Sequence, residues 1–121
     1  MTSRAERVLL DHELNALMLK FSRNGVTVDL LSRSGRVAIT KFLVAKNLRG
    51  RGLARSTVTH LCTWADKYSH TLGLTPSAMY GSDIERLTTF FGQYGFVANP
   101  EERQPLRAHD ALVRYPKGGQ S

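Results

Sequence analysis

The sequence predicts a single α/β domain, in which a mixed β-sheet carries helices on its faces. Two observations predict this class. At 121 residues and 41% hydrophobic content, the chain has the length of one domain and enough apolar residues for a packed core. Segments with helical spacing of apolar residues alternate with short segments of strand character, as in layered α/β domains.

The first part of the chain predicts a helix followed by a β-hairpin. Apolar residues recur at steps of three and four up to Phe21, as on the buried stripe of a helix. Asn24-Gly25 is a turn signal that ends this helix. Two segments with alternating apolar residues then flank a polar turn, which is typical of paired, half-buried strands. The predicted elements are a helix over 4–21, a strand over 26–30, a turn over 32–35 and a strand over 37–44.

The second part predicts two helices and three short strands. Helical spacing continues from Gly52 to Leu72, and Gly73 is expected to end this helix as a left-handed cap. In this helix, Trp64 and Cys62 are expected to pack in the core, and His60 and His70 are expected to be exposed to solvent. The other predicted elements are a strand over 75–80, a helix over 84–94, a strand from 96, a strand over 111–115 and a disordered tail over 117–121, which leaves one domain over 1–116.

Composition argues against several protein classes. No apolar run approaches the ~20 residues that a membrane-spanning helix needs. The N-terminal residues mix acids and bases, unlike a secretion signal. Cys62 is the only cysteine, so an internal disulfide is excluded and a cysteine zinc site is not expected. We therefore expect a cytoplasmic protein that binds neither a metal nor a membrane.

The net charge of +7 is concentrated in one third of the chain. Residues 30–65 contain no Asp or Glu, while the basic and acidic residues elsewhere are equal in number. Such a concentration indicates either an anionic partner or a solvated basic face that serves solubility. The basic residues of this window are Arg33, Arg36, Lys41, Lys46, Arg49, Arg51 and Arg55.

The segment that joins the second strand to the long helix has the features of an anion site. The first turn of a helix leaves main-chain N–H groups without partners and carries partial positive charge. Gly50 and Gly52 would let a phosphate approach the backbone closely, and Arg49, Arg51 and Arg55 add charge around it.

This segment can be compared with three known kinds of phosphate site. A P-loop requires a Gly-Lys-Ser/Thr ending, which is missing. A dinucleotide fingerprint requires a third glycine and an acidic residue about 20 positions later, and this spacing fails. An Arg-Gly patch that contacts nucleic acid phosphates is the third reading, but such patches usually lie in disordered tails.

Two motifs resemble those of the GNAT acyl-CoA N-acyltransferases. "RGRGLA", Arg49 to Ala54, resembles motif A of that family, Arg/Gln-x-x-Gly-x-Gly/Ala, through Arg49, Gly52 and Ala54. The preceding "FLVAKNL" is similar to the strand along which the family lays the pantetheine arm. "LTTFFGQYGF", residues 87–96, is similar to the second motif, a helix with an aromatic pair followed by Gly-Phe. The resemblance covers about residues 26–115.

The resemblance implies a GNAT-like fold, with a mixed, mostly antiparallel sheet, and an acyltransferase that uses acetyl-CoA as co-substrate and no metal. The implied activity is transfer of an acetyl group to a primary amine, with a protein lysine or N-terminus favoured as acceptor. Strand amides would pair with pantetheine, and the amides of the glycine turn would wrap the pyrophosphate. The implied coenzyme-binding residues are Leu43, Val44, Lys46, Arg49, Gly50, Arg51, Gly52, Leu53, Ala54, Arg55 and Phe91.

The catalytic residues implied by the family are less well matched. A base must deprotonate the amine, and a general acid, often a Tyr, protonates the leaving thiolate. Phe91 stands where the family often has that Tyr and cannot donate a proton. Tyr94 or Tyr80 could replace it, or the thiolate could leave unassisted, while Asp83 and Asp110 are the candidate bases.

The acceptor side is also reduced, because one helix replaces the usual first strand and helix pair of the family. The chain thus resembles compact GNATs of bacteria and their phages, which suggests a bacterial or phage-infected cell as its location. Either a second subunit, as in a homodimer, completes the acceptor site, or a protein substrate fills it. The alternative function is a non-catalytic GNAT-like module whose basic face binds nucleic acid or another anionic partner.

Overall fold

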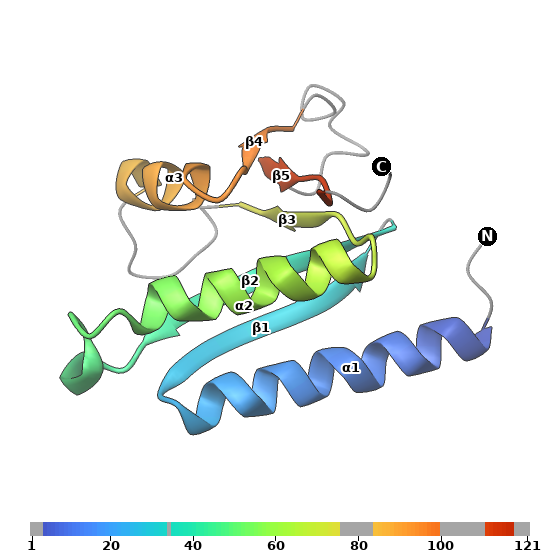
Figure 1. Cartoon of the computed structure of the whole chain (residues 1–121), viewed down its shortest axis with the longest axis horizontal. Helices are drawn as coiled ribbons and strands as arrows, with labels where there is room; N and C mark the ends of the chain where they lie inside the picture. The colour runs from blue at the N-terminus through green and yellow to red at the C-terminus, as the bar shows by residue number, and fades with distance from the viewer. Residues whose placement is uncertain (1–3, 34, 76–83, 100–110, 118–121) are drawn as a thin grey trace.

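The computed structural model describes residues 4–33, 35–75, 84–99 and 111–117. These residues form three α-helices, one 3-10 helix and five strands (Figure 1), so the α/β class is confirmed. In chain order the elements are α1 (Arg4–Arg23), β1 (Val26–Arg33), β2 (Arg36–Val44), η1 (Lys46–Leu48), α2 (Leu53–Lys67), β3 (Leu72–Leu74), α3 (Ile84–Gly92), β4 (Val97–Ala98) and β5 (Leu112–Arg114).

The strands form one open sheet in the order β1-β2-β3-β5-β4. β1 pairs with β2, β3 with β5 and β4 with β5, all antiparallel, whereas β2 and β3 are parallel. The parallel pair requires a crossover connection, which α2 provides. The prediction of a mixed, mostly antiparallel sheet with a hairpin at its start is therefore confirmed.

Helices α1 and α2 lie over the same face of the hairpin (Figure 1). Alternate β1 residues Val26, Val28 and Leu30 are buried on that face, while Thr27 and Leu31 on the other are exposed. The sequence predicts helices on the faces of the sheet, and among the described helices α1 and α2 cover one face of the hairpin. Core side chains of the two helices are Leu14, Leu17 and Phe21 from α1 and Val58, Leu61 and Ala65 from α2.

The helix predicted over 52–72 is shorter than expected. α2 ends at Lys67, and the chain turns at Ser69, whose φ of 59° lies in the left-handed region. Leu72–Leu74 is the central strand β3, and all of its residues are buried. Gly73, predicted as a helix cap, pairs instead with neighbours in β2 and β5. The predicted helix was too long because the apolar residues of β3, which is buried on both faces, continue the three- and four-residue spacing of the helix.

Of the strand predicted over 75–80, the structure describes only Thr75, which follows β3 and is not part of a strand. The rest of that predicted strand lies outside the described residues.

Of the side chains assigned around α2, two are packed as predicted, and the prediction for a third is wrong. Trp64 and Cys62 are buried, as predicted, and burial raises the pKa of the Cys62 thiol, which disfavours the reactive thiolate. His70 was expected to be solvated on the helix, and this is wrong. It follows the helix, is half-buried and stacks on Trp64 with ring centroids 4.8 Å apart, and this burial lowers its pKa.

Among the described residues, no helix combines the length and apolar character needed to cross a membrane.

A buried ion pair joins the end of α2 to β5. Arg114, whose side chain is 4% exposed, donates two hydrogen bonds to the Asp66 carboxylate at 2.8 and 3.0 Å. Its Nε donates to the Tyr94 carbonyl at 2.7 Å, and the Lys117 amide donates to Asp66. The pair therefore fixes the segment between α3 and β4 against α2.

We expect Asp66→Asn to lower the free energy of unfolding at pH 7 by about 2 kcal/mol, less than for a fully buried pair because the Asp66 side chain is 27% exposed. The hydrogen bonds from Arg114 hold the pKa of Asp66 below its usual value. The ion pair therefore contributes fully above pH ~4 and is lost as the pH falls through the lower folded-state pKa. In urea unfolding, the difference in the free energy of unfolding between wild type and variant should therefore disappear at acid pH.

Asp29→Asn, on the exposed face of β1, is the control and should leave stability nearly unchanged. A gap for Asp66→Asn that stays constant from pH 7 to pH 2 would contradict the role of the ion pair.

Candidate functional site

The glycine turn between η1 and α2 requires glycine for its backbone shape. Gly50 and Gly52 have φ values of 83° and 77°, in the left-handed region that residues with a Cβ rarely adopt. A Cβ built on either glycine would meet no atom within 4 Å. A side chain at either position would therefore not clash with the described part of the protein, and the space next to the turn is open.

Main-chain N–H groups at this turn are free to bind a ligand. The first backbone hydrogen bond into the helix runs from the Ser56 amide to the Gly52 carbonyl at 3.0 Å. Gly52 has no side chain to cap the helix. The amides of residues 51–55 have no hydrogen-bond acceptor within the part of the chain that the structure describes. They form the unsatisfied, partially positive end of a helix of 15 residues.

Just before this turn, strand β2 is paired on one edge only. It pairs with β3 only from Val37 to Ile39 and then continues to Val44 beside β1 alone, as far as the described strands extend. The β1–β2 register jumps between Asp29–Lys41 and Leu30–Ile39, so Thr40 is an extra residue in β2. Such a bulge bends a strand and redirects its backbone groups.

The free edge of β2 presents the main chain of Val44. The Ala45 amide donates to the Gly25 carbonyl at 2.9 Å and so points toward β1. Because backbone groups alternate along a strand, Val44 and Phe42 face the opposite, open edge and Leu43 faces β1. Arg49 Nε donates to the Val44 carbonyl at 3.2 Å across that edge. Among the strand amides predicted to pair with pantetheine, the Val44 amide therefore faces the open edge, where a ligand could bind it.

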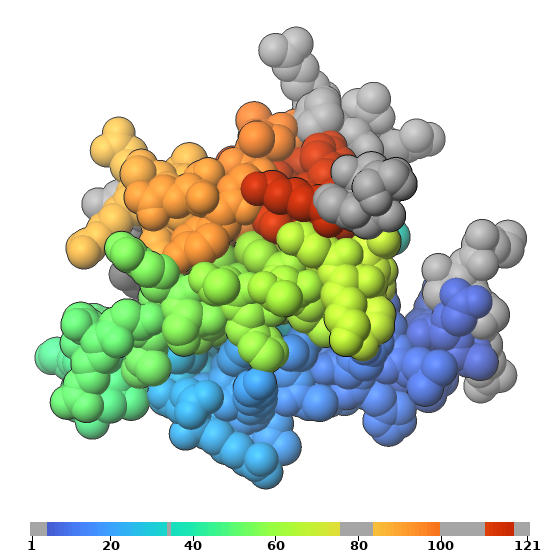
Figure 2. Space-filling model, viewed as in Figure 1, coloured from blue at the N-terminus to red at the C-terminus, as the bar shows by residue number. Residues whose placement is uncertain are grey.

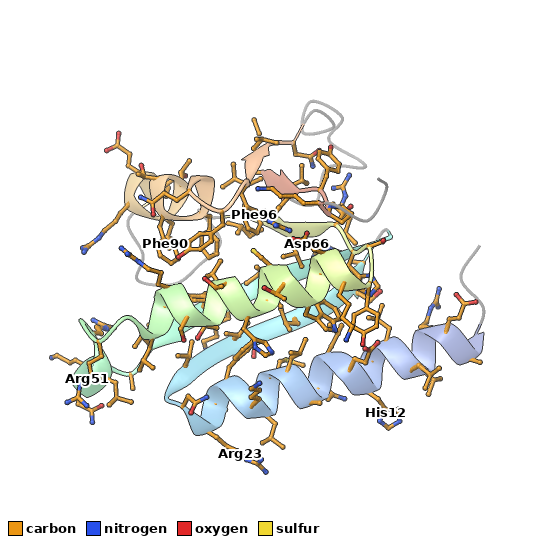
Figure 3. The ribbon with its side chains drawn as sticks, in the orientation of Figure 1. His12, Arg23, Arg51, Asp66, Phe90 and Phe96 are labelled. Carbon is orange, nitrogen blue, oxygen red and sulfur yellow. The ribbon has the colours of Figure 1, made fainter. Side chains whose placement is uncertain are left out.

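The basic window divides into separate groups in space. Lys46, Arg49, Arg51 and Arg55 surround the glycine turn, are exposed and form no ion pair within the described residues (Figure 3 labels Arg51). Lys41 is exposed in the middle of β2. The remaining two, Arg33 and Arg36, lie at the far end of the hairpin, so the basic window does not form a single patch around the turn.

A groove lies between the start of α2 and the helix of the second motif. Its volume is about 450 Å³, and its lining residues are Arg55, Glu85, Arg86, Thr89, Phe90 and Gln93. Arg55 was predicted as a coenzyme-binding residue and Phe90 belongs to the aromatic pair of the second motif, whereas Thr89 and Gln93 were not predicted as site residues. A larger cavity of about 660 Å³ lies at the other end of the molecule, between α1 and the hairpin turn, and contains none of the predicted site residues.

The aromatic pair of the second motif has one buried and one partly exposed member. Phe91 has no exposed surface and packs edge-on against Phe42 and Phe96, with centroids 5.5 and 5.2 Å apart. Phe90 also contacts Phe42, and it lines the groove. The coenzyme-binding role predicted for Phe91 stays a prediction, and in this structure Phe90 is the ring that a ligand could touch.

Of the four candidate catalytic residues, the structure describes only Tyr94. Tyr80, Asp83 and Asp110 lie outside the described residues. Tyr94 is half-buried, one turn beyond Phe90, and the two ring centroids are 5.4 Å apart. Its carbonyl is held by Arg114. Within the described ranges, no three His, Cys, Asp or Glu side chains gather as they would around a metal ion.

No family model matches the chain, and no curated protein sequence matches it either. The functional argument therefore depends on the motifs and on the geometry of the turn, the open strand edge and the groove.

We expect Phe42→Ala to lower the free energy of unfolding by about 3–5 kcal/mol, because Phe42 is buried and its ring joins β2 to both aromatics of α3. Leu43→Ala, at the next position but 42% exposed, should cost under about 1 kcal/mol. Urea unfolding measures both. Equal losses would mean that β2 and α3 do not pack through Phe42.

Proposed function

We propose that the protein is an acetyl-CoA-dependent N-acetyltransferase of the GNAT type, which transfers an acetyl group to a primary amine of a protein, on a lysine or at an N-terminus. The observation that carries this proposal is the row of unbonded amides at residues 51–55, located directly beyond the open edge of β2. A diphosphate and an extended amide-containing arm are the two ligand groups that such a pair of features suits.

In this proposal the coenzyme lies across both features. Its pyrophosphate accepts hydrogen bonds from the amides that follow Gly52, and Arg49, Arg51 and Arg55 add positive charge around it. The pantetheine arm runs along the free edge of β2 and pairs with Val44. The binding energy of this remote nucleotide holds the thioester in place for attack.

The order of the elements supports the same proposal. Motif A occupies the connection from β2 to α2, and the second motif forms α3, with which Arg55 lines one groove. A phosphate site where a strand turns into a crossover helix follows the general placement of ligands at the carboxyl ends of parallel strands.

The proposed chemistry is direct transfer. A neutral amine forms a bond to the thioester carbonyl carbon and gives its proton to a base; the carbon–sulfur bond then breaks, and the thiolate takes up a proton. A lysine amine has an ordinary pKa near ~10.4, so a base is required at neutral pH. Asp83 and Asp110 are the candidate bases, and Tyr94 and Tyr80 the candidate proton donors.

The groove beside Arg55 is an open depression, which suits an extended acceptor such as a protein segment better than an enclosed small amine.

We expect acetyl-CoA to stabilise the protein against heat, by about 2.7 kcal/mol at a hundred times its Kd, and Gly52→Glu to abolish this stabilisation. The substitution places a negative side chain in open space beside the unbonded amides. Gly35→Glu is a matched control, because Gly35 also has an open, left-handed backbone, at the other end of β2. If both variants kept the wild-type response to acetyl-CoA, the site would be misassigned.

We expect Tyr94→Phe to lower kcat for thiol release to a lysine peptide by roughly 10²-fold, with the affinity for acetyl-CoA unchanged, if Tyr94 is the proton donor. A release assay over a panel of peptides and small amines gives this value. An unaltered kcat would show that Tyr94 is not the proton donor. The remaining alternatives would be Tyr80 as the donor, or a thiolate that leaves without a proton donor. No thiol release with any amine would contradict the enzyme proposal and leave a coenzyme-binding module.

A further inference from the structure

Positive charge at the glycine turn continues onto a second helix. The last turn of α1 carries Lys20 and Arg23, both exposed. We define the basic end as these two residues together with the four around the turn: Lys20, Arg23, Lys46, Arg49, Arg51 and Arg55.

Several contacts bring these residues to one end of the molecule. Lys20 and Asn24 line a cavity of about 280 Å³ with Leu53 and Ser56 of α2, and Lys20 Nζ lies 3.5 Å from His60 Nε2. The Ala45 amide binds the Gly25 carbonyl, which places the end of α1 beside η1. Figure 2 shows the last turn of α1 and the start of α2 as neighbouring parts of one surface.

One acidic residue, Glu85, lies near the basic end, because it lines the groove with Arg55. None of the six basic side chains forms an ion pair within the described residues. Of the acidic residues of α1, Glu6 and Asp11 lie in its first half and Glu13 at its middle, whereas its last turn carries Lys20 and Arg23. The charge is thus separated along the molecule, and a polyanion would be drawn to one end.

We propose that the basic end binds the phosphodiester backbone of duplex nucleic acid without regard to sequence. Four of the six residues are arginines, whose planar fork matches phosphate oxygens. Lys20 and Arg23 lie on the α1 side of α2, away from the groove with α3, and so extend the charge beyond the proposed coenzyme site. Residues of α1 and of the glycine turn thus contribute to one basic surface.

The aromatic residues favour a duplex over a single strand. Proteins that hold single strands stack bases on exposed aromatic rings. Within the described chain, the exposed tyrosines are Tyr68 and Tyr115, which follow α2 and β5 and are remote from the basic end. Phe90 lines the groove with Arg55, but its ring is partly buried and packs on Phe42, so it offers little surface for a stacked base.

The test is fluorescence anisotropy with a random-sequence DNA duplex of about 20 base pairs, titrated at several salt concentrations between ~50 and ~200 mM. Wild-type protein should bind, and log Kd should rise linearly with log salt. Lys20→Gln/Arg23→Gln should weaken binding and reduce that slope by about 2, because each lost phosphate contact removes ~0.9. Arg7→Gln/Lys67→Gln removes the same charge elsewhere and should leave the slope unchanged.

Absence of salt-dependent binding by the wild type would overturn the proposal, as would equal weakening by both double variants, which would indicate net charge alone. Polyglutamate that competed as strongly as DNA would also overturn it, by assigning the basic end to an acidic protein. Acetyl-CoA melting of Lys20→Gln/Arg23→Gln separates this inference from the proposed function. That response should match wild type, and it tests the coenzyme site whatever the DNA result.

Discussion

The main-chain N–H groups at the start of α2 are the constraint on which the proposed site depends. A helix cannot satisfy these groups itself, and most proteins cap them with a serine, threonine or aspartate side chain. Here the capping position is Gly52, and the described residues supply no acceptor for the amides that follow. The same turn is surrounded by cations that form no ion pair within the described residues, so it has the features that favour an anionic ligand.

The separation of β2 from β3 is the second constraint, and packing maintains it. Thr40 adds a residue to β2, so Phe42, three positions after Ile39, keeps its side chain on the same face of the hairpin, where Phe42 pairs with Val28 and Ile39 with Leu30. The Phe42 side chain packs on the α3 aromatics, while its main chain faces the open edge. The Asp66–Arg114 pair holds the segment after α3 against α2. Beyond Ile39, none of the described strands pairs with this edge of β2.

The sequence predicted the hairpin, the crossover helix and the glycine turn because each has a local signal. It failed at β3, because Leu72–Leu74 is buried on both faces and has no alternation that distinguishes it from the end of a helix. It also failed to predict the groove residues Thr89 and Gln93, since only tertiary packing brings α3 beside Arg55. The bulge at Thr40 depends on cross-strand register, and a single chain gives no signal for it.

The most direct test is a titration of ¹⁵N-labelled protein with acetyl-CoA, followed by amide NMR. The account predicts that the largest chemical-shift changes and new protection from hydrogen exchange occur at the amides of residues 51–55, with a further change at Val44. Saturating acetyl-CoA that left the amides of residues 51–55 unshifted and in rapid exchange would contradict the assignment of this turn as the pyrophosphate site.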